Sequence, residues 1–255
     1  MRLPRFRRPA LAVAVLALLL VASGCGSSPV PAPGPNVGTA LDGAIPKAIL
    51  DLPLRDSAGR VRHLSDFAGK VLVISDSMTL CQETCPLDTA SVVHTARRVA
   101  AASDSSRVEF LTITVDPQRD TVPQLRAYRR LYAGPSNWLT LTGRPQVVDE
   151  LWKYFGVYRK KVPADQPPPH NWRTGKVLTY DVQHSDEVFF LDGRQRERFI
   201  LEGAPVVPDK AQIPKRVYRF LSKDGRKNVA HPADTAWTEA QAVDVVSWLL
   251  DRRIA

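Results

Sequence analysis

Apolar residues occur along this chain in two alternating patterns, short uninterrupted runs and stripes spaced three or four residues apart. The runs at 71–74 and 108–115 are short and rich in β-branched residues, which is typical of buried strands. Between them, helical spacing connects Val92, Val93, Ala96, Val99 and Ala100. Because a strand, a helix and a second strand follow one another, the pattern predicts a βαβ unit with parallel pairing.

The same alternation continues toward the C-terminus. Helical stripes follow residues 120 and 145, and a short strand is expected between them at 138–141. A capping box, Thr238-Glu-Ala-Gln241, opens a final helix. We therefore expect an α/β fold whose sheet is mainly parallel, with helices on its faces and a helix at the C-terminus.

Two segments near the C-terminus depart from this alternation. Asp192-Gly193 is a strong hairpin turn, so the apolar segments 188–191 and 198–201 should pair antiparallel. Residues 203–235 contain four prolines and carry few structural signals, although 217–221 are interpreted as an extra strand. The expected architecture thus includes a terminal β-hairpin before the last helix.

The N-terminus has the composition of an export signal. A basic region precedes the apolar run 11–21, which is shorter than the roughly 20 residues of a membrane span. The run ends at Val21-Ala22-Ser23-Gly24-Cys25, which resembles the lipobox of bacterial lipoproteins, and this implies that Cys25 is acylated. We therefore expect a signal peptide at 1–24 and a protein anchored by lipid to the outer face of the cytoplasmic membrane.

The remaining chain divides into a tether and one domain. Residues 26–35 are rich in proline, glycine and serine, so 25–45 are expected to form a lipidated flexible tether and 46–255 a single domain. The net charge of +9 falls to +5 without the four arginines of the signal. Because no basic block is interleaved with aromatic residues, nucleic acid is not an expected partner.

Two cysteines remain for chemistry once Cys25 carries lipid. Cys81 and Cys85 lie between the strand at 71–74 and a helix that should begin near Pro86. A helix N-terminus favours thiolate over thiol, so both sulfurs are expected to be reactive. The i, i+4 spacing allows a disulfide or the binding of one soft metal ion, and spacing alone does not choose between them. A disulfide across so short a loop would stabilise the fold little, which favours a functional role.

Several motifs occur together and in order. They are Phe67-Ala-Gly-Lys70, Cys81-x-x-x-Cys85-Pro86, Thr114-Val-Asp-Pro-Gln-Arg-Asp-Thr121, Leu141-Thr-Gly143 and Asp181-Val-Gln-His-Ser185. Together they resemble the Sco/SenC family of copper-binding assembly factors, over roughly 50–201. The resemblance implies a thioredoxin-like fold, with a central mixed sheet flanked by helices, a terminal β-hairpin and a C-terminal helix.

The resemblance also implies a site and a function. Cys81, Cys85 and His184 would bind one copper per chain, as Cu(I) and as Cu(II), and the protein would help to assemble the copper centre of a respiratory cytochrome c oxidase. Its partners would be the copper-accepting subunit of that oxidase and a copper donor or thiol reductant. Two thiolates and an imidazole suit copper, whereas structural zinc prefers four ligands.

An enzymatic alternative remains open. The protein is interpreted as a non-catalytic copper chaperone, but an extracytoplasmic thiol-disulfide oxidoreductase acting on oxidase cysteines would use Cys81 and Cys85 as its catalytic pair. Thioredoxins place a cis-proline opposite that pair, and the segment 182–186 holds His184 and no proline, which favours metal. A thiol peroxidase is less favoured, because no activating arginine is evident beside Cys81.

Five further residues are considered near the site. Asp116 falls at the same end of the sheet as the cysteines and is expected to support the site electrostatically, whereas Asp120 is interpreted as a helix cap. Asp76 and Glu83 depart from the family pattern and would bring negative charge near the site. His170 is the one other histidine considered as an accessory.

Overall fold

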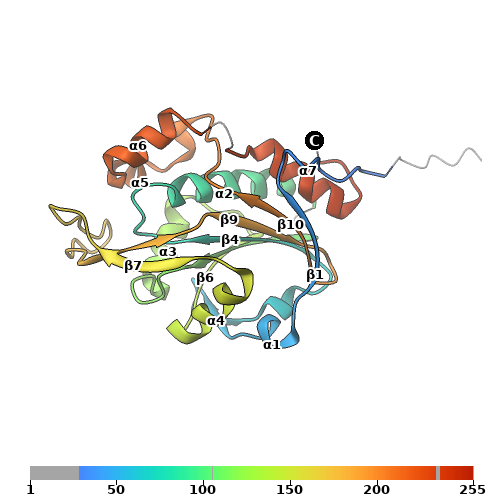
Figure 1. The fold of residues 1–255 in the computed structure, drawn as a ribbon, viewed down its shortest axis with the longest axis horizontal. Helices are drawn as coiled ribbons and strands as arrows, with labels where there is room; N and C mark the ends of the chain where they lie inside the picture. Colours follow the sequence, from blue (N-terminus) through green and yellow to red (C-terminus); the bar gives the residue numbers. More distant parts are fainter. Residues whose placement is uncertain (1–28, 105, 234–235, 255) are drawn as a thin grey trace, which may run out of the picture.

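A mixed eight-stranded sheet forms the centre of the computed structural model, which describes residues 29–104, 106–233 and 236–254 (Figure 1). In spatial order its strands are β1 (Thr39–Ala44), β10 (Arg196–Glu202), β9 (Glu187–Leu191), β4 (Val71–Ser77), β5 (Val108–Thr114), β6 (Trp138–Thr142), β2 (Leu54–Asp56) and β3 (Val61–Arg62). Strands β7 (Arg159–Pro163) and β8 (Tyr180–His184) pair separately as a two-stranded ribbon.

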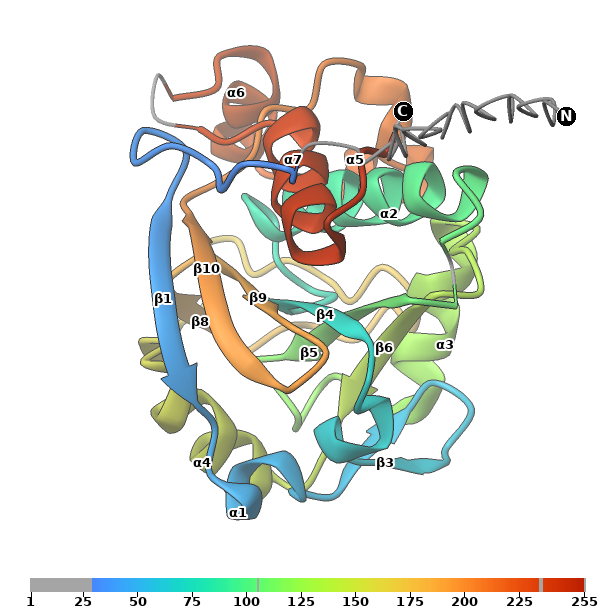
Figure 2. The same ribbon diagram turned by 90° about the vertical axis from the view of Figure 1, so that its right-hand side faces the viewer.

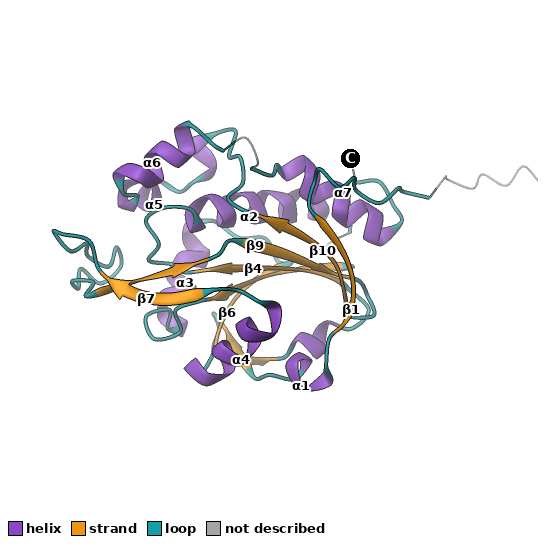
Figure 3. Ribbon diagram, viewed as in Figure 1, coloured by secondary structure: helices purple, strands orange, loops and turns teal. Residues whose placement is uncertain are grey.

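Helices occupy both faces of the sheet (Figure 3). They are α1 (Lys47–Leu50), α2 (Cys85–Ala101), α3 (Val122–Leu131), α4 (Pro145–Phe155), α5 (Lys215–Phe220), α6 (Lys223–Ala230) and α7 (Glu239–Leu250), with short 3-10 turns η1 (Leu64–Phe67) and η2 (Lys210–Gln212). Helices α2 and α7 pack over one face, and α1 and α4 lie over the other. Within the described residues, no helix combines the length and apolar character needed to cross a membrane.

The core is divided between the two faces by the alternation of side chains along the strands. In β4, Val71 and Val73 point into the layer beneath α2 and α7, whereas Leu72 and Ile74 point into the layer above α1 and α4. All seven residues of β4 are buried, which explains why its first four, 71–74, form a continuous apolar run rather than an alternating pattern.

The prediction of a mainly parallel sheet is wrong, because only β4–β5 and β5–β6 are parallel. The terminal hairpin β9–β10 lies beside β4 and pairs with it antiparallel, which makes the sheet mixed. The hairpin itself forms as predicted around Asp192-Gly193, and the capping box at Thr238 opens α7 as predicted. Pairing of β9 with β4 is the contact that brings the end of β8 to the cysteine loop.

Two other sequence expectations are corrected. Residues 39–44, assigned to the flexible tether, form β1 and pair antiparallel with β10 at the edge of the sheet (Figure 2). The backbone of β10 supplies this pairing, so a weakly apolar segment can form a strand there. Residues 217–221, interpreted as a strand, belong mostly to α5. Cys25 and the predicted signal peptide lie outside the described residues.

Candidate metal centre

The two cysteines lie in the loop that connects β4 to α2. Strand β4 ends at Ser77, and α2 begins at Cys85 with Pro86 in its first turn, where a missing N–H leaves no helical hydrogen bond unmade. Both are free thiols and both are buried, Cys81 with 6% and Cys85 with 0% of its surface exposed. The predicted start of a helix at the cysteines is confirmed.

His184 reaches the cysteines from a different part of the chain. It ends β8, immediately before β9, and its Nε2 lies 3.2 Å from the Sγ of Cys85. This contact joins residues 99 positions apart in sequence. The structure therefore brings the predicted ligand His184 against the predicted ligand Cys85.

Asp76 fixes the orientation of the His184 ring. The Nδ1 of His184 lies 2.6 Å from Oδ2 of Asp76 and 2.7 Å from the carbonyl oxygen of Ser185. Because both neighbours of Nδ1 are acceptors, Nδ1 carries a proton and donates it, which directs Nε2 to Cys85. The other carboxylate oxygen of Asp76 accepts from the backbone N–H of Glu187, so Asp76 is itself held in place.

A carboxylate behind a histidine is a common arrangement around protein metal sites, because it sets the tautomer and makes the free nitrogen a better donor. Sequence analysis noted Asp76 only as added negative charge. A signal was present, since an acidic residue within the buried strand β4 requires a partner. That partner lies 108 positions away.

The two thiols differ in acidity. A hydrogen bond from Cys85 lowers the pKa of Cys81 well below its ordinary value, against the opposing effect of burial, and His184 lowers it further. Burial raises the pKa of Cys85 well above its ordinary value, and the neighbouring Cys81 raises it more. The helix N-terminus is expected to make both sulfurs reactive, and the surroundings divide them, since they favour the thiolate of Cys81 and the neutral thiol of Cys85.

Acidic groups surround the pair. Burial, with Asp186 and Asp76 nearby, raises the pKa of Asp88 well above its ordinary value, which favours the neutral form of this carboxyl. Burial raises the pKa of Asp186 to about 6 and that of Glu187 to about 7. Burial alone would lower the pKa of His184, but its bonds to Asp76 and Cys81 raise it well above its ordinary value. Positive charge at His184 is therefore favoured by its surroundings.

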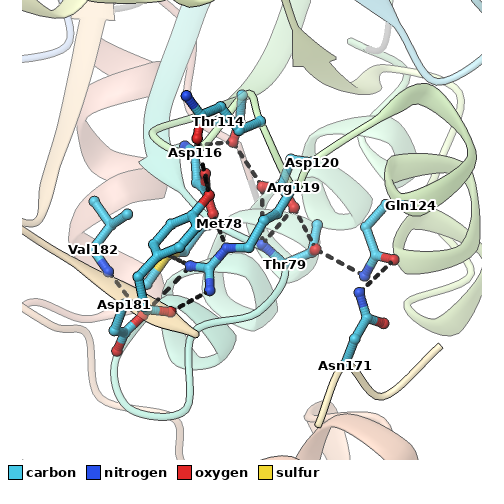
Figure 4. A network of polar contacts seen from close by, with 12 residues as sticks. Met78, Thr79, Thr114, Asp116, Arg119, Asp120, Gln124, Asn171, Asp181 and Val182 are labelled. Carbon is cyan, nitrogen blue, oxygen red and sulfur yellow. Dashed lines mark hydrogen bonds and ion pairs between the residues drawn. The ribbon is translucent and has the colours of Figure 1, made fainter. Parts of the chain in front are cut away.

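Asp116 belongs to a neighbouring polar network rather than to the Cys81, Cys85 and His184 cluster (Figure 4). Its carboxylate accepts from the guanidinium of Arg119 and from the hydroxyl of Tyr180, and Arg119 also donates to the Sδ of Met78. Among the described contacts, none joins Asp116 to a cysteine or to His184. Its expected electrostatic effect on the site would have to act through this network.

Asp120 is a buried anchor of the cysteine loop, and its interpretation as a helix cap is wrong. The N-cap of α3 is Thr121, whereas Asp120 accepts from the backbone N–H of Thr79 and from the hydroxyl of Thr114. Burial, with Asp116 nearby, raises the pKa of Asp120 to about 6. The network extends from Thr79 to Gln124, so it ties the start of the cysteine loop to α3 (Figure 4).

His170 is exposed, and its contact with the described chain is a backbone bridge to Val177. It contributes nothing to the cluster. Cys85 contacts His184, and Cys81 interacts with both. Two thiol sulfurs and one imidazole nitrogen are a donor set suited to a soft ion such as Cu(I) and able to hold Cu(II). The residues present therefore fit the binding of copper.

Comparison with known proteins places this site in a family context. A family model described as SCO1/SenC matches residues 50–213. The mitochondrial SCO2 homolog of Bos taurus is 30% identical over 141 residues, which are 55% of this chain and 48% of that protein. The chain thus spans about half the length of this curated relative.

The comparison extends to solved structures. A crystal structure from Aquifex aeolicus VF5 superposes with a TM-score of 0.51 at 19% identity, covering 72% of this chain and 97% of that one. Bradyrhizobium japonicum ScoI, solved with copper bound, gives 0.45 at 21% identity and covers 66% and 93%. The predicted thioredoxin-like fold and the predicted family resemblance are both confirmed.

Proposed function

The chain belongs to the SCO1/SenC family, and from this premise we propose that it is a copper metallochaperone that assists assembly of the copper centre of a respiratory cytochrome c oxidase. Copper is its cargo, one ion per chain, held as Cu(I) or Cu(II) by Cys81, Cys85 and His184. Its partners are a copper donor or thiol reductant and the copper-accepting subunit of the oxidase.

One observation carries the proposal, the contact of Cys85 with a histidine that is already oriented by Asp76. The Nε2 atom of His184 faces the Sγ of Cys85 at 3.2 Å, and the proton on Nδ1 is held by Asp76 at 2.6 Å. The arrangement supplies a ring nitrogen that can bind a metal beside two sulfurs.

These residues account for both loading and release. Cys81, with its lowered pKa, is the thiol that loses its proton more readily, and Cys85 and the Nε2 position give up protons when copper binds. Three protein donors leave room for a fourth donor from a partner, so copper can pass from one protein to the other without free release. The Nδ1 proton stays with Asp76 throughout.

The oxidoreductase alternative is supported by the difference between the two thiols. A Cys81 thiolate would attack a disulfide sulfur of the oxidase subunit, release one partner thiolate and form a mixed disulfide. Cys85, after losing its proton, would then attack Cys81, release the second partner thiol and leave Cys81 and Cys85 oxidised. The lowered pKa of Cys81 and the raised pKa of Cys85 suit these two steps.

Transfer to the oxidase subunit distinguishes the two functions. We expect reduced, copper-loaded protein to deliver one equivalent of copper to the reduced subunit, monitored by the absorption of its assembled copper centre. Copper-free reduced protein, mixed with the oxidised subunit, should leave its disulfide largely intact. If the disulfide is reduced rapidly while no copper is delivered, the oxidoreductase function replaces the chaperone.

We further propose that the protein acts outside the cytoplasm, anchored to the outer face of the cytoplasmic membrane by lipid on Cys25. The lipobox-like residues before Cys25 support this proposal. Changing Cys25 to serine should move the protein from the membrane fraction to the soluble fraction or leave the signal peptide uncleaved. Fractionation followed by mass measurement of the N-terminus makes the distinction, and a processed variant that stays with the membrane would refute lipidation.

A further inference from the structure

Helices α5 and α6 form a segment that the family match does not include. The match ends at residue 213, whereas α5 begins at Lys215 and α6 ends at Ala230. The two helices lie at one end of α2, on the side of the molecule where the cysteine loop is found (Figure 1). Their place in the fold raises the question of what this segment does for the site.

The segment is hydrogen-bonded to the residues between the two cysteines and packs against them. The backbone N–H of Ser222 donates to the carbonyl oxygen of Gln82 at 2.9 Å, and the side-chain amide of Gln82 donates to the carbonyl oxygen of Phe220 at 2.7 Å. A Cβ on Gly225 would lie 2.1 Å from that same Gln82 oxygen, so only glycine permits this approach. The first turn of α6 therefore packs directly on the Cys81–Cys85 loop.

The segment also holds the positive charge of the chain. Residues 215–230 contain six basic and one acidic side chain, whereas outside this segment and the four arginines at the N-terminus the chain has 25 of each sign. All six basic side chains are exposed, and none forms an ion pair with a described residue. They are Lys215, Arg216, Arg219, Lys223, Arg226 and Lys227.

Grooves with aromatic walls lie among these charges. One, of about 470 Å³, is lined by Trp172, Arg216, Arg219 and Phe220. A second, of about 500 Å³, adjoins it and is lined in part by Tyr218 and Lys215. Tryptophan, tyrosine and arginine are the residues that contribute most at protein interfaces, because they bury large areas and make directed polar contacts.

We propose that the α5–α6 segment is a docking surface for an acidic face of the protein that accepts copper from this site. The proposal rests on the chaperone function and identifies how its acceptor is recognised. A local excess of positive charge steers an acidic partner toward its own position, and here that position is the loop between the copper-binding cysteines. The segment thus orients the acceptor at the metal centre.

An anionic membrane is the other class of partner that such charge could attract, and the placement of the chain favours a protein. The described chain starts near Asp251, at the end of α7, where the backbone N–H of Val30 donates to the Asp251 carboxylate. Figure 1 shows α5–α6 and α7 over opposite ends of α2. The start of the described chain therefore lies at the other end of α2 from the basic segment.

A charge-reversal variant tests the proposal in the full-length protein. Lys215, Arg219 and Lys223 are changed together to glutamate, and the matched control changes Arg144, Lys153 and Arg194, which are exposed and form no ion pair with a described residue. The probe is the copper-accepting oxidase subunit in uncharged detergent, titrated at about 20 and about 150 mM salt. Vesicles with and without an anionic phospholipid are the second probe.

We expect the reversal to weaken binding of the subunit by about tenfold or more at the lower salt, mainly through slower association, and to abolish the salt dependence. The control should change affinity less than about twofold, and copper binding by both variants should equal that of the parent. A version with glutamine at the three positions should show a smaller loss in the same direction, which preserves the test if the glutamate variant folds poorly.

Three results would overturn the proposal. The first is a control variant that loses as much affinity for the subunit as the reversal does, and the second is a reversal that leaves subunit binding unchanged. The third is a reversal that weakens binding to anionic vesicles but not to the subunit, which would make the segment a membrane surface. Copper binding is measured separately on the same samples. If the parent binds the subunit but holds no copper, the chaperone function fails while the docking surface stands.

Discussion

Oxidised protein should take up no copper. Two-electron oxidation removes both thiol protons and joins Cys81 to Cys85 as a disulfide, whereas copper binding requires the same two sulfurs as thiolates. The described residues contain no cysteine besides these two, which are buried beside His184, so no other described thiol can replace them. We therefore expect one equivalent of copper on the reduced chain and a complete loss of uptake after oxidation.

Alkylation followed by mass spectrometry measures this competition. Copper should protect both cysteines from the alkylating reagent, because coordination occupies the lone pairs that would attack it. In the copper-free reduced protein, Cys81 should be labelled before Cys85, since its pKa is lowered and that of Cys85 is raised. The double serine variant, reduced or oxidised, is the control and should bind no copper. Equal labelling rates with and without copper would contradict a shared site.

Replacing His184 with alanine should weaken Cu(II) binding far more than Cu(I) binding. Two thiolates alone still suit the softer Cu(I) ion, whereas Cu(II) needs the imidazole nitrogen. Removing a residue that hydrogen-bonds to a metal ligand typically lowers metal affinity by about 10- to 100-fold. Removing the ligand itself should therefore lower Cu(II) affinity by more than about 100-fold. Competition titrations with chelators of known affinity measure both ions. Changing the exposed His170 to alanine is the matched control and should leave both affinities unchanged.

The Asp76 to asparagine variant completes this series. It keeps the shape of the side chain but removes the charge behind His184, and we expect Cu(II) affinity to fall by about 10- to 100-fold. Burial lowers the pKa of His184, Asp76 raises it, and the net effect is an increase. Removing the charge of Asp76 should therefore lower this pKa and move the pH dependence of Cu(II) binding to lower pH. A lower affinity with an unchanged pH profile would mean that Asp76 serves only to support the fold. Unchanged Cu(II) binding in the His184 variant would remove the histidine from the ligand set.

Local sequence determined the elements that hold the cysteines. The apolar run of β4, the proline after Cys85 and the helical spacing beyond it each act within a few residues, so strand, loop and helix could be predicted together. The same holds for the hairpin at Asp192-Gly193 and the capping box at Thr238. The ordered motifs added the family and, through it, the expected role of His184.

Local signals failed where a contact partner is distant. Residues 217–221 are a short apolar segment whose pattern suits a strand or a helix, and only packing on Gln82 distinguishes the two. Asp120 lies in a segment with the composition of a helix start, but its side chain is buried against Thr79, which lies 41 positions earlier. Residues 39–44 become a strand because β10 offers them an edge.

The tertiary structure alone decided how the site is built. Asp76 and His184 lie 108 positions apart, and their contact exists because β9 pairs with β4 and carries the end of β8 to the cysteine loop. The unequal acidity of Cys81 and Cys85 likewise follows from burial and from their neighbours rather than from their spacing. The sequence could name the candidate ligands from its motifs. The partner that orients one of them depended on which strands the whole fold placed side by side, because backbone preferences act over only one or two turns of the chain.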